Sequence, residues 1–244
     1  MKIMIIEIKS SEEFNRLLDA LGSELWEADF HLQIFRALTD KVETFGREYN
    51  QSPTFWTFTF RAHRDAAIFG LMRIYDGNSE SLSLRNLLDT IKDNQPMFDE
   101  PQFRERLKNN PYVDSLAADA KKPDDGELEK DIEFASAKNP LVKKLIIWRN
   151  NLYAHRNAQN VVDDYQIGTD HPLTVKELES LVTMGYEIFN RYKNLFDASM
   201  QSGILVGLDD YEFVLTSIKA TLEQRDREWK EQIGKIQEYE ARNR

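Results

Sequence analysis

Apolar side chains recur every three or four positions along most of this 244-residue sequence, which is the spacing of amphipathic helices. The pattern is clearest in residues 139–157, NPLVKKLIIWRNNLYAHRN. Asn139 can cap the free amides at a helix start, and Pro140 suits the first helical position, where no N–H is needed. An apolar stripe follows, formed by Leu141, Leu145, Trp148 and Leu152. We therefore predict an all-α fold that contains this helix.

Arg149 and Arg156 fall inside the apolar arc of this helix, and His155 lies at its edge. Because a guanidinium is almost never buried without a partner, these arginines must face either carboxylates or a wet, functional surface. Asp65 and Asp76 both lie on an apolar face of an earlier helix and therefore need cationic partners. We predict that the two helices face each other and that Asp65 or Asp76 supports the arginines. A structural salt bridge in a helical core would give the same sequence pattern.

The segment RNNLYAH places a small polar residue, Asn150, directly after Arg149, and His155 follows near a helix end. This arrangement resembles the signature of HEPN domains. The segments WTFTFRAHRDAAIFGLMRIYD and GLDDYEFVL favour the abortive-infection AbiU-type branch. The resemblance implies a HEPN-like antiparallel helical bundle. We expect this bundle to span residues 10–200, with 77–138 as an insertion-like helical cover and 209–244 as a long C-terminal helical extension.

The resemblance also implies metal-independent RNA cleavage, in which the ribose 2′-hydroxyl attacks the neighbouring phosphate and leaves a 2′,3′-cyclic phosphate. In this interpretation His155 is the acid–base group, Arg149 offsets the charge on the phosphorane, and Asn150 orients Arg149 or the substrate. Lys144 and Arg156 are weaker candidates for contacts with the RNA backbone. We expect no metal and no cofactor.

Arg149 and His155 are six positions apart, and hence about 120° apart on an ideal helix. Either the arginine reaches around the helix, or two protomers build the site together. The resemblance implies the second arrangement, a homodimer through residues 139–157. Such a dimer would join two basic islands, because residues 134–162 contain no Asp or Glu although the chain has a net charge of −10.

Three other interpretations remain open. The chain could be a catalytically inactive HEPN module that binds RNA or protein, with the Arg–His pair serving as structural glue. It could be a toxin in phage defence whose site is masked by an antitoxin or another partner protein. It could also be a plain helical scaffold in which the motif is accidental.

The sequence has no cysteine and no apolar run of membrane-spanning length. We therefore expect a cytoplasmic protein without disulfides, thiolate metal sites or membrane partners. His31 and His63 are predicted to be packed or surface residues, and His171, in a loop, is more typical of a bystander than of a catalytic group.

Start and stop signals predict the remaining helices. They cover residues 10–22, 23–50, 53–76, 81–94, 174–199 and 209–244. The second half of the last helix is highly charged, with a narrow apolar seam at Trp229, Ile233 and Ile236. Such a seam suits a partner helix or a packed arm, and a solvated protruding helix is the simpler interpretation.

Overall fold

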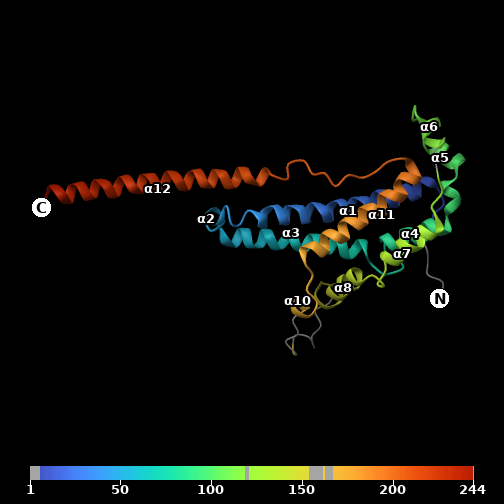
Figure 1. The fold of residues 1–244 in the computed structure, drawn as a ribbon, viewed down its shortest axis with the longest axis horizontal. Helices are drawn as coiled ribbons and strands as arrows, with labels where there is room; N and C mark the ends of the chain where they lie inside the picture. The colour runs from blue at the N-terminus through green and yellow to red at the C-terminus, as the bar shows by residue number, and fades with distance from the viewer. Residues whose placement is uncertain (1–5, 119–120, 154–161, 163–166, 244) are drawn as a thin grey trace. The chain divides into compact units, whose positions relative to one another are not determined.

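The structure, a computed structural model, describes residues 6–118, 121–153, 162 and 167–243. These residues form helices joined by turns and loops, and no strand occurs among them (Figure 1). The predicted all-α fold is therefore confirmed. No helix in this part of the chain is both long enough and apolar enough to cross a membrane.

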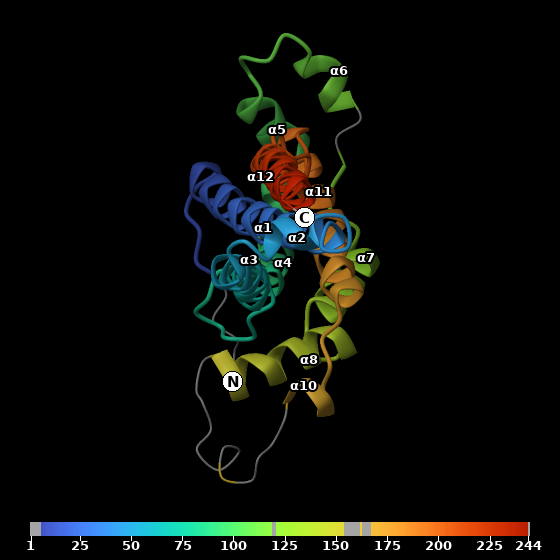
Figure 2. The same ribbon diagram turned by 90° about the vertical axis from the view of Figure 1, so that its left-hand side faces the viewer.

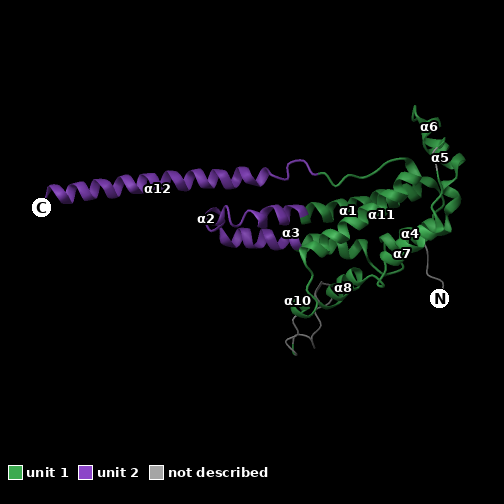
Figure 3. Ribbon diagram, in the orientation of Figure 1, with its two compact units in different colours: residues 1–32, 65–204 green, residues 33–64, 205–244 purple. Residues whose placement is uncertain are grey.

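The chain divides into two compact units (Figure 3). Unit 1 comprises residues 1–32 and 65–204, and unit 2 comprises residues 33–64 and 205–244. Both boundaries in the first third of the chain fall inside long helices, α1 (Ser11–Asp40) and α3 (Pro53–Ile74). Unit 1 further contains α4 (Leu84–Asp93), η1 (Gln95–Phe98), α5 (Glu100–Arg106), α6 (Val113–Ala118), α7 (Asp125–Phe134), α8 (Pro140–Trp148), η2 (Arg149–Tyr153), α10 (Ile167–Asp170) and α11 (Val175–Asp197). Unit 2 further contains α2 (Gly46–Tyr49) and α12 (Asp210–Arg242).

The core of unit 1 is built from aromatic and aliphatic side chains of α1, α3, α4, α8 and α11. Phe14 lies edge-on to Phe196, with ring centroids 4.8 Å apart, and Phe98 packs against both rings. Tyr75 is fully buried at the end of α3, where its hydroxyl donates to the carbonyl of Leu181 at 2.7 Å. This bond satisfies a polar atom that would otherwise destabilise the core.

Helix α1 runs without a break through Gly22, so the predicted helix end at this glycine is wrong. The glycine serves packing instead. A Cβ at Gly22 would lie 2.9 Å from the ring of Phe189 and 2.2 Å from the side chain of Gln201. The Gln201 amide also donates to the Gly22 carbonyl at 2.7 Å. The close approach of Phe189 and Gln201 explains why a glycine occupies position 22. This packing is not visible in the sequence alone.

The predicted helix starts at Asn139 and Thr174 are confirmed. The Asn139 side chain accepts from the amide of Leu141 at 2.9 Å, and Pro140 follows in the first turn. Thr174 and Glu177 form a reciprocal capping box at the start of α11. These caps satisfy amides that have no partner within the helix, and so they fix where α8 and α11 begin.

Unit 2 has a separate, smaller core formed by Leu38, Phe45, Tyr49, Trp56 and Leu215. Tyr49 packs edge-on against Trp56 with ring centroids 4.9 Å apart, and its hydroxyl donates to the carbonyl of Leu38. Burial raises the pKa of Tyr49 to about 12, so this phenol stays protonated and keeps its donor role.

Candidate functional site

The motif predicted from sequence lies where a regular helix changes its geometry. Val142 and Leu145 bury the inner face of α8, and Leu141 and Trp148 are partly buried against the same core. At Arg149 the backbone leaves α geometry and continues as the π-helix η2. The prediction of one regular α-helix over residues 139–157 is therefore wrong at Arg149–Tyr153, and residues 154–157 lie outside the described residues. A π-helix has wider turns than an α-helix, so an angle of 100° per residue does not describe Arg149–Tyr153.

Arg149 contacts Asp76, one of the two carboxylates named from the sequence. Nη1 of the guanidinium donates to Oδ1 of Asp76, and the two side chains are 34% and 17% exposed. The same carboxylate oxygen accepts from the amide of Asn78 at 3.0 Å. Asp65, the other carboxylate, is partly buried further back along α3. The ion pair orients the guanidinium, and a third of the arginine side chain still faces solvent.

Asn150 is exposed at the start of η2, next to Arg149. The following residue, Asn151, is partly buried and donates from Nδ2 to the carbonyl of Ile147 at 2.8 Å. The sequence motif names Asn150 alone. The structure adds Asn151 as a side chain that bonds the backbone where α8 joins η2, and a mid-helix asparagine is a sign of such backbone bonding.

Contacts between α8 and the segment before α11 were not predicted from sequence. Nζ of Lys144 donates to the Pro172 carbonyl at 2.8 Å and pairs with the Glu177 carboxylate. Trp148 donates from Nε1 to the backbone carbonyl of His171 at 2.6 Å. Figures 1 and 2 place α8 and the short helix α10 side by side in both views. Lys144, named as a weak candidate for RNA contacts, therefore has its ammonium engaged within the protein.

Glu177 has three roles at this junction. It caps α11, it accepts from the Thr174 hydroxyl at 3.0 Å, and it pairs with Lys144. Burial acts to raise the pKa of Glu177, but the hydrogen bonds from Lys144 and Thr174 outweigh burial and hold the pKa below its ordinary value. The carboxylate is therefore charged near neutral pH, which stabilises the Lys144 ammonium beside it.

His155 and Arg156 lie outside the described residues. The structure thus places the arginine half of the motif, with Arg149, Asn150 and Asp76 together. Among the described residues, no group of three or more His, Asp or Glu side chains is arranged to hold a metal ion.

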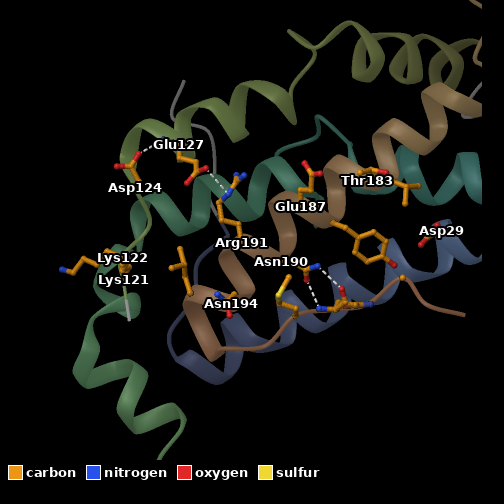
Figure 4. Close-up of a pocket in the computed structure, with 16 residues that line it drawn as sticks. Asp29, Lys121, Lys122, Asp124, Glu127, Thr183, Glu187, Asn190, Arg191 and Asn194 are labelled. Carbon is orange, nitrogen blue, oxygen red and sulfur yellow. Dashed lines mark hydrogen bonds and ion pairs between the residues drawn. The ribbon is translucent and has the colours of Figure 1, made fainter. Parts of the chain in front are cut away.

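The cavity drawn in Figure 4 lies elsewhere in unit 1, along α11, and has a volume of about 870 Å³. Its lining carries both charge signs. Arg191 bonds Glu127 at 3.2 Å and pairs with the buried Asp131, and Lys122 bonds Asp99 at 2.5 Å. Arg191 and Lys122 are therefore both neutralised by carboxylates.

The described residues form an all-helical fold, with an Arg–Asn pair where a capped helix ends, and both features agree with a HEPN-type domain. A model of the family described as AbiU2 matches residues 11–221. The chain belongs to this family, HEPN_AbiU2, so the resemblance read from the motif is confirmed. A search of curated proteins and a search of solved structures each gave no match.

Proposed function

We propose that this protein is a metal-independent RNA endonuclease. In the proposed reaction the 2′-oxygen of a ribose loses its proton and attacks the adjacent phosphorus. The bond from phosphorus to the 5′-oxygen of the next nucleotide breaks, and that oxygen takes up a proton. The products are a 2′,3′-cyclic phosphate and a free 5′-hydroxyl.

The position of Arg149 is the observation that carries this proposal. A carboxylate holds Arg149 through one nitrogen, while the partly exposed guanidinium keeps further N–H donors for a phosphate. Asn150 is exposed beside it, and both residues lie in a π-helical turn. Such turns are rare in proteins, and those that occur are often found at functional sites. Membership of the HEPN_AbiU2 family adds the expected class of chemistry.

His155 has the acid–base role in this proposal, because an imidazole near its ordinary pKa can take the 2′-hydroxyl proton or supply the leaving oxygen with one. Two chains pair through residues 139–157, so that the arginine of one protomer works with the histidine of the other. The pairing joins two acid-free segments, residues 134–162, and concentrates positive charge where RNA lies.

In the cell the enzyme acts as a cytoplasmic toxin in phage defence, restrained by a partner protein.

The test is incubation of the purified chain with a mixed RNA pool in excess chelator, followed by analysis of the RNA ends. We expect cleavage with 2′,3′-cyclic phosphate ends, and a loss of at least a hundredfold in rate for His155→Ala and for Arg149→Ala. Lys176→Ala is the matched control, because Lys176 is an exposed lysine on α11, outside residues 134–162, and the variant should keep the wild-type rate. No cleavage by the wild type, or full activity of His155→Ala, would contradict the proposal.

The Arg149–Asp76 ion pair also favours a second candidate, a catalytically inactive HEPN module that binds RNA or protein. Each single substitution, Arg149→Asp or Asp76→Arg, should destabilise the fold by about 1 kcal/mol, the scale of a partly exposed charged hydrogen bond. The double swap should restore the unfolding midpoint in urea. In an endonuclease, the swap restores stability and leaves cleavage absent. In a binding module, the wild type binds RNA or its partner without cutting, and the swap binds equally well.

A further inference from the structure

The last helix of unit 2 extends beyond the hydrophobic core of that unit. Helix α12 has 33 residues, which at 1.5 Å per residue makes it about 50 Å long. Its first half is anchored, since Leu215 and Leu222 are buried. Asp226 forms a two-pronged ion pair with Arg47, at 2.5 and 2.7 Å. Figure 3 shows α12 continuing past α2 toward the C-terminus.

Beyond Asp226 the apolar side chains of α12 are exposed. Trp229 is 65% exposed, Ile233 37%, Ile236 58% and Tyr239 71%. These residues follow one another at spacings of four, three and three, so they form one seam along the helix. A seam with this spacing is what two helices bury between them when they wrap around each other.

The charges beside the seam indicate which partner fits. Residues 227–242 carry four basic side chains, Arg227, Lys230, Lys235 and Arg242, and four acidic ones, Glu228, Glu231, Glu238 and Glu240. The segment is neutral within a chain of net charge −10. Interspersed charges of both signs that sum to zero can pair with those of a second copy of the same segment. They do not suit a phosphate backbone or an anionic membrane, which favour an excess of Lys and Arg.

The segment also lies outside the part of the chain that the AbiU2 family shares. The family match ends at residue 221, before the exposed seam begins. The seam therefore belongs to an extension of the common domain, and it is separate from the motif helix in unit 1.

We propose that residues 227–242 pair, helix against helix, with the same segment of a second copy of this chain. Pairing buries the seam, and long helices usually draw most of their stability from such contacts rather than from intrinsic propensity. The proposal does not depend on RNA cleavage. It concerns a surface different from residues 139–157, so either association can exist without the other.

Site-specific cross-linking tests this pairing, because the chain has no native cysteine. In the full-length protein under mild oxidation, Ile233→Cys should form a disulfide-linked dimer at least tenfold faster than Glu238→Cys, which lies on the opposite face of the helix. A single cysteine leaves the other three seam residues in place, so its result does not depend on disrupting the helix. Equal rates for the two variants would overturn the proposal.

Sedimentation equilibrium supplies an independent measurement. The combined Trp229→Glu and Ile236→Glu variant should weaken dimerisation at least tenfold, with circular dichroism showing whether helix content is kept. A wild-type chain that remains monomeric at high micromolar concentration would overturn the proposal. Pairing through residues 139–157 would leave a dimer in the double-glutamate variant, so the comparison is between the self-association of the wild type and that of the variant. Equal self-association of the two proteins would overturn the proposal.

Discussion

Near the motif, single side chains with several partners hold neighbouring helices together. Glu177 illustrates this, because one carboxylate caps α11 and binds Lys144 of α8. Its partners can be predicted from sequence only in part. The capping box with Thr174 is local and was predicted, whereas Lys144 lies 33 positions away and carries no local sign of the contact.

The depressed pKa of Glu177 makes a prediction about pH and stability. A carboxyl whose pKa is lower in the folded state stabilises the fold above its unfolded pKa, close to 4.5, and loses this contribution as pH falls through the folded value. Glu177→Gln keeps a side chain that can complete the capping box and removes only the charge. We expect the variant to be less stable than the wild type at pH 7, with the difference shrinking below pH 4.5. Urea unfolding of both proteins across this range checks it, and a difference independent of pH would contradict it.

The ion pair of Arg149 shows the same limit of sequence reasoning. The pattern narrowed its partners to Asp65 and Asp76, since both share an apolar helix face. The structure selects Asp76, which lies just after α3 ends, where the Asn78 amide also bonds it. The choice depends on how far the two helices overlap along their length, and helical periodicity does not determine that overlap.

At the level of elements, two helical glycines differ in their surroundings, since one is closely packed against another helix and the other has no neighbouring atoms. In unit 1, Gly70 of α3 lies against Ala28 of α1, and a Cβ on Gly70 would come within 2.7 Å of the Ala28 Cβ and 3.3 Å of its Cα. Gly234 of α12 has no atom within 4 Å of its would-be Cβ. Both glycines are in helices, so intrinsic propensity alone favours alanine at both by about 1 kcal/mol.

Alanine substitution should therefore act in opposite directions at these two sites. We expect Gly70→Ala to destabilise the protein by about 1–3 kcal/mol. The new methyl group would meet the Cβ and the backbone Cα of Ala28, and these atoms cannot move away without shifting helix α1. Gly234→Ala should leave stability unchanged or raise it by up to about 1 kcal/mol. Urea unfolding measures both changes. Stabilisation by Gly70→Ala would mean that α1 and α3 are not in close contact at this point.

At the scale of the whole molecule, the helical class and the family could be predicted, because each depends on local patterns that repeat along the chain. The division into units could not be predicted. The sequence suggested one bundle over residues 10–200 with a C-terminal extension, whereas the contacts group residues 33–64 with 205–244. This grouping depends on packing between segments far apart in sequence, such as Leu38 and Trp56 with Leu215.

Separate cores predict separate responses to core truncation. Trp56 in unit 2 and Phe189 in unit 1 are 6% and 1% exposed, and truncating such aromatics typically costs about 3–5 kcal/mol. We expect Trp56→Ala to speed amide hydrogen exchange mainly in residues 33–64 and 205–222, and Phe189→Ala to speed it mainly in residues 65–204. Hydrogen exchange read by mass spectrometry tests this directly. If either variant raised exchange equally in both sets of residues, the chain would unfold as one cooperative body and the two cores would not be energetically distinct.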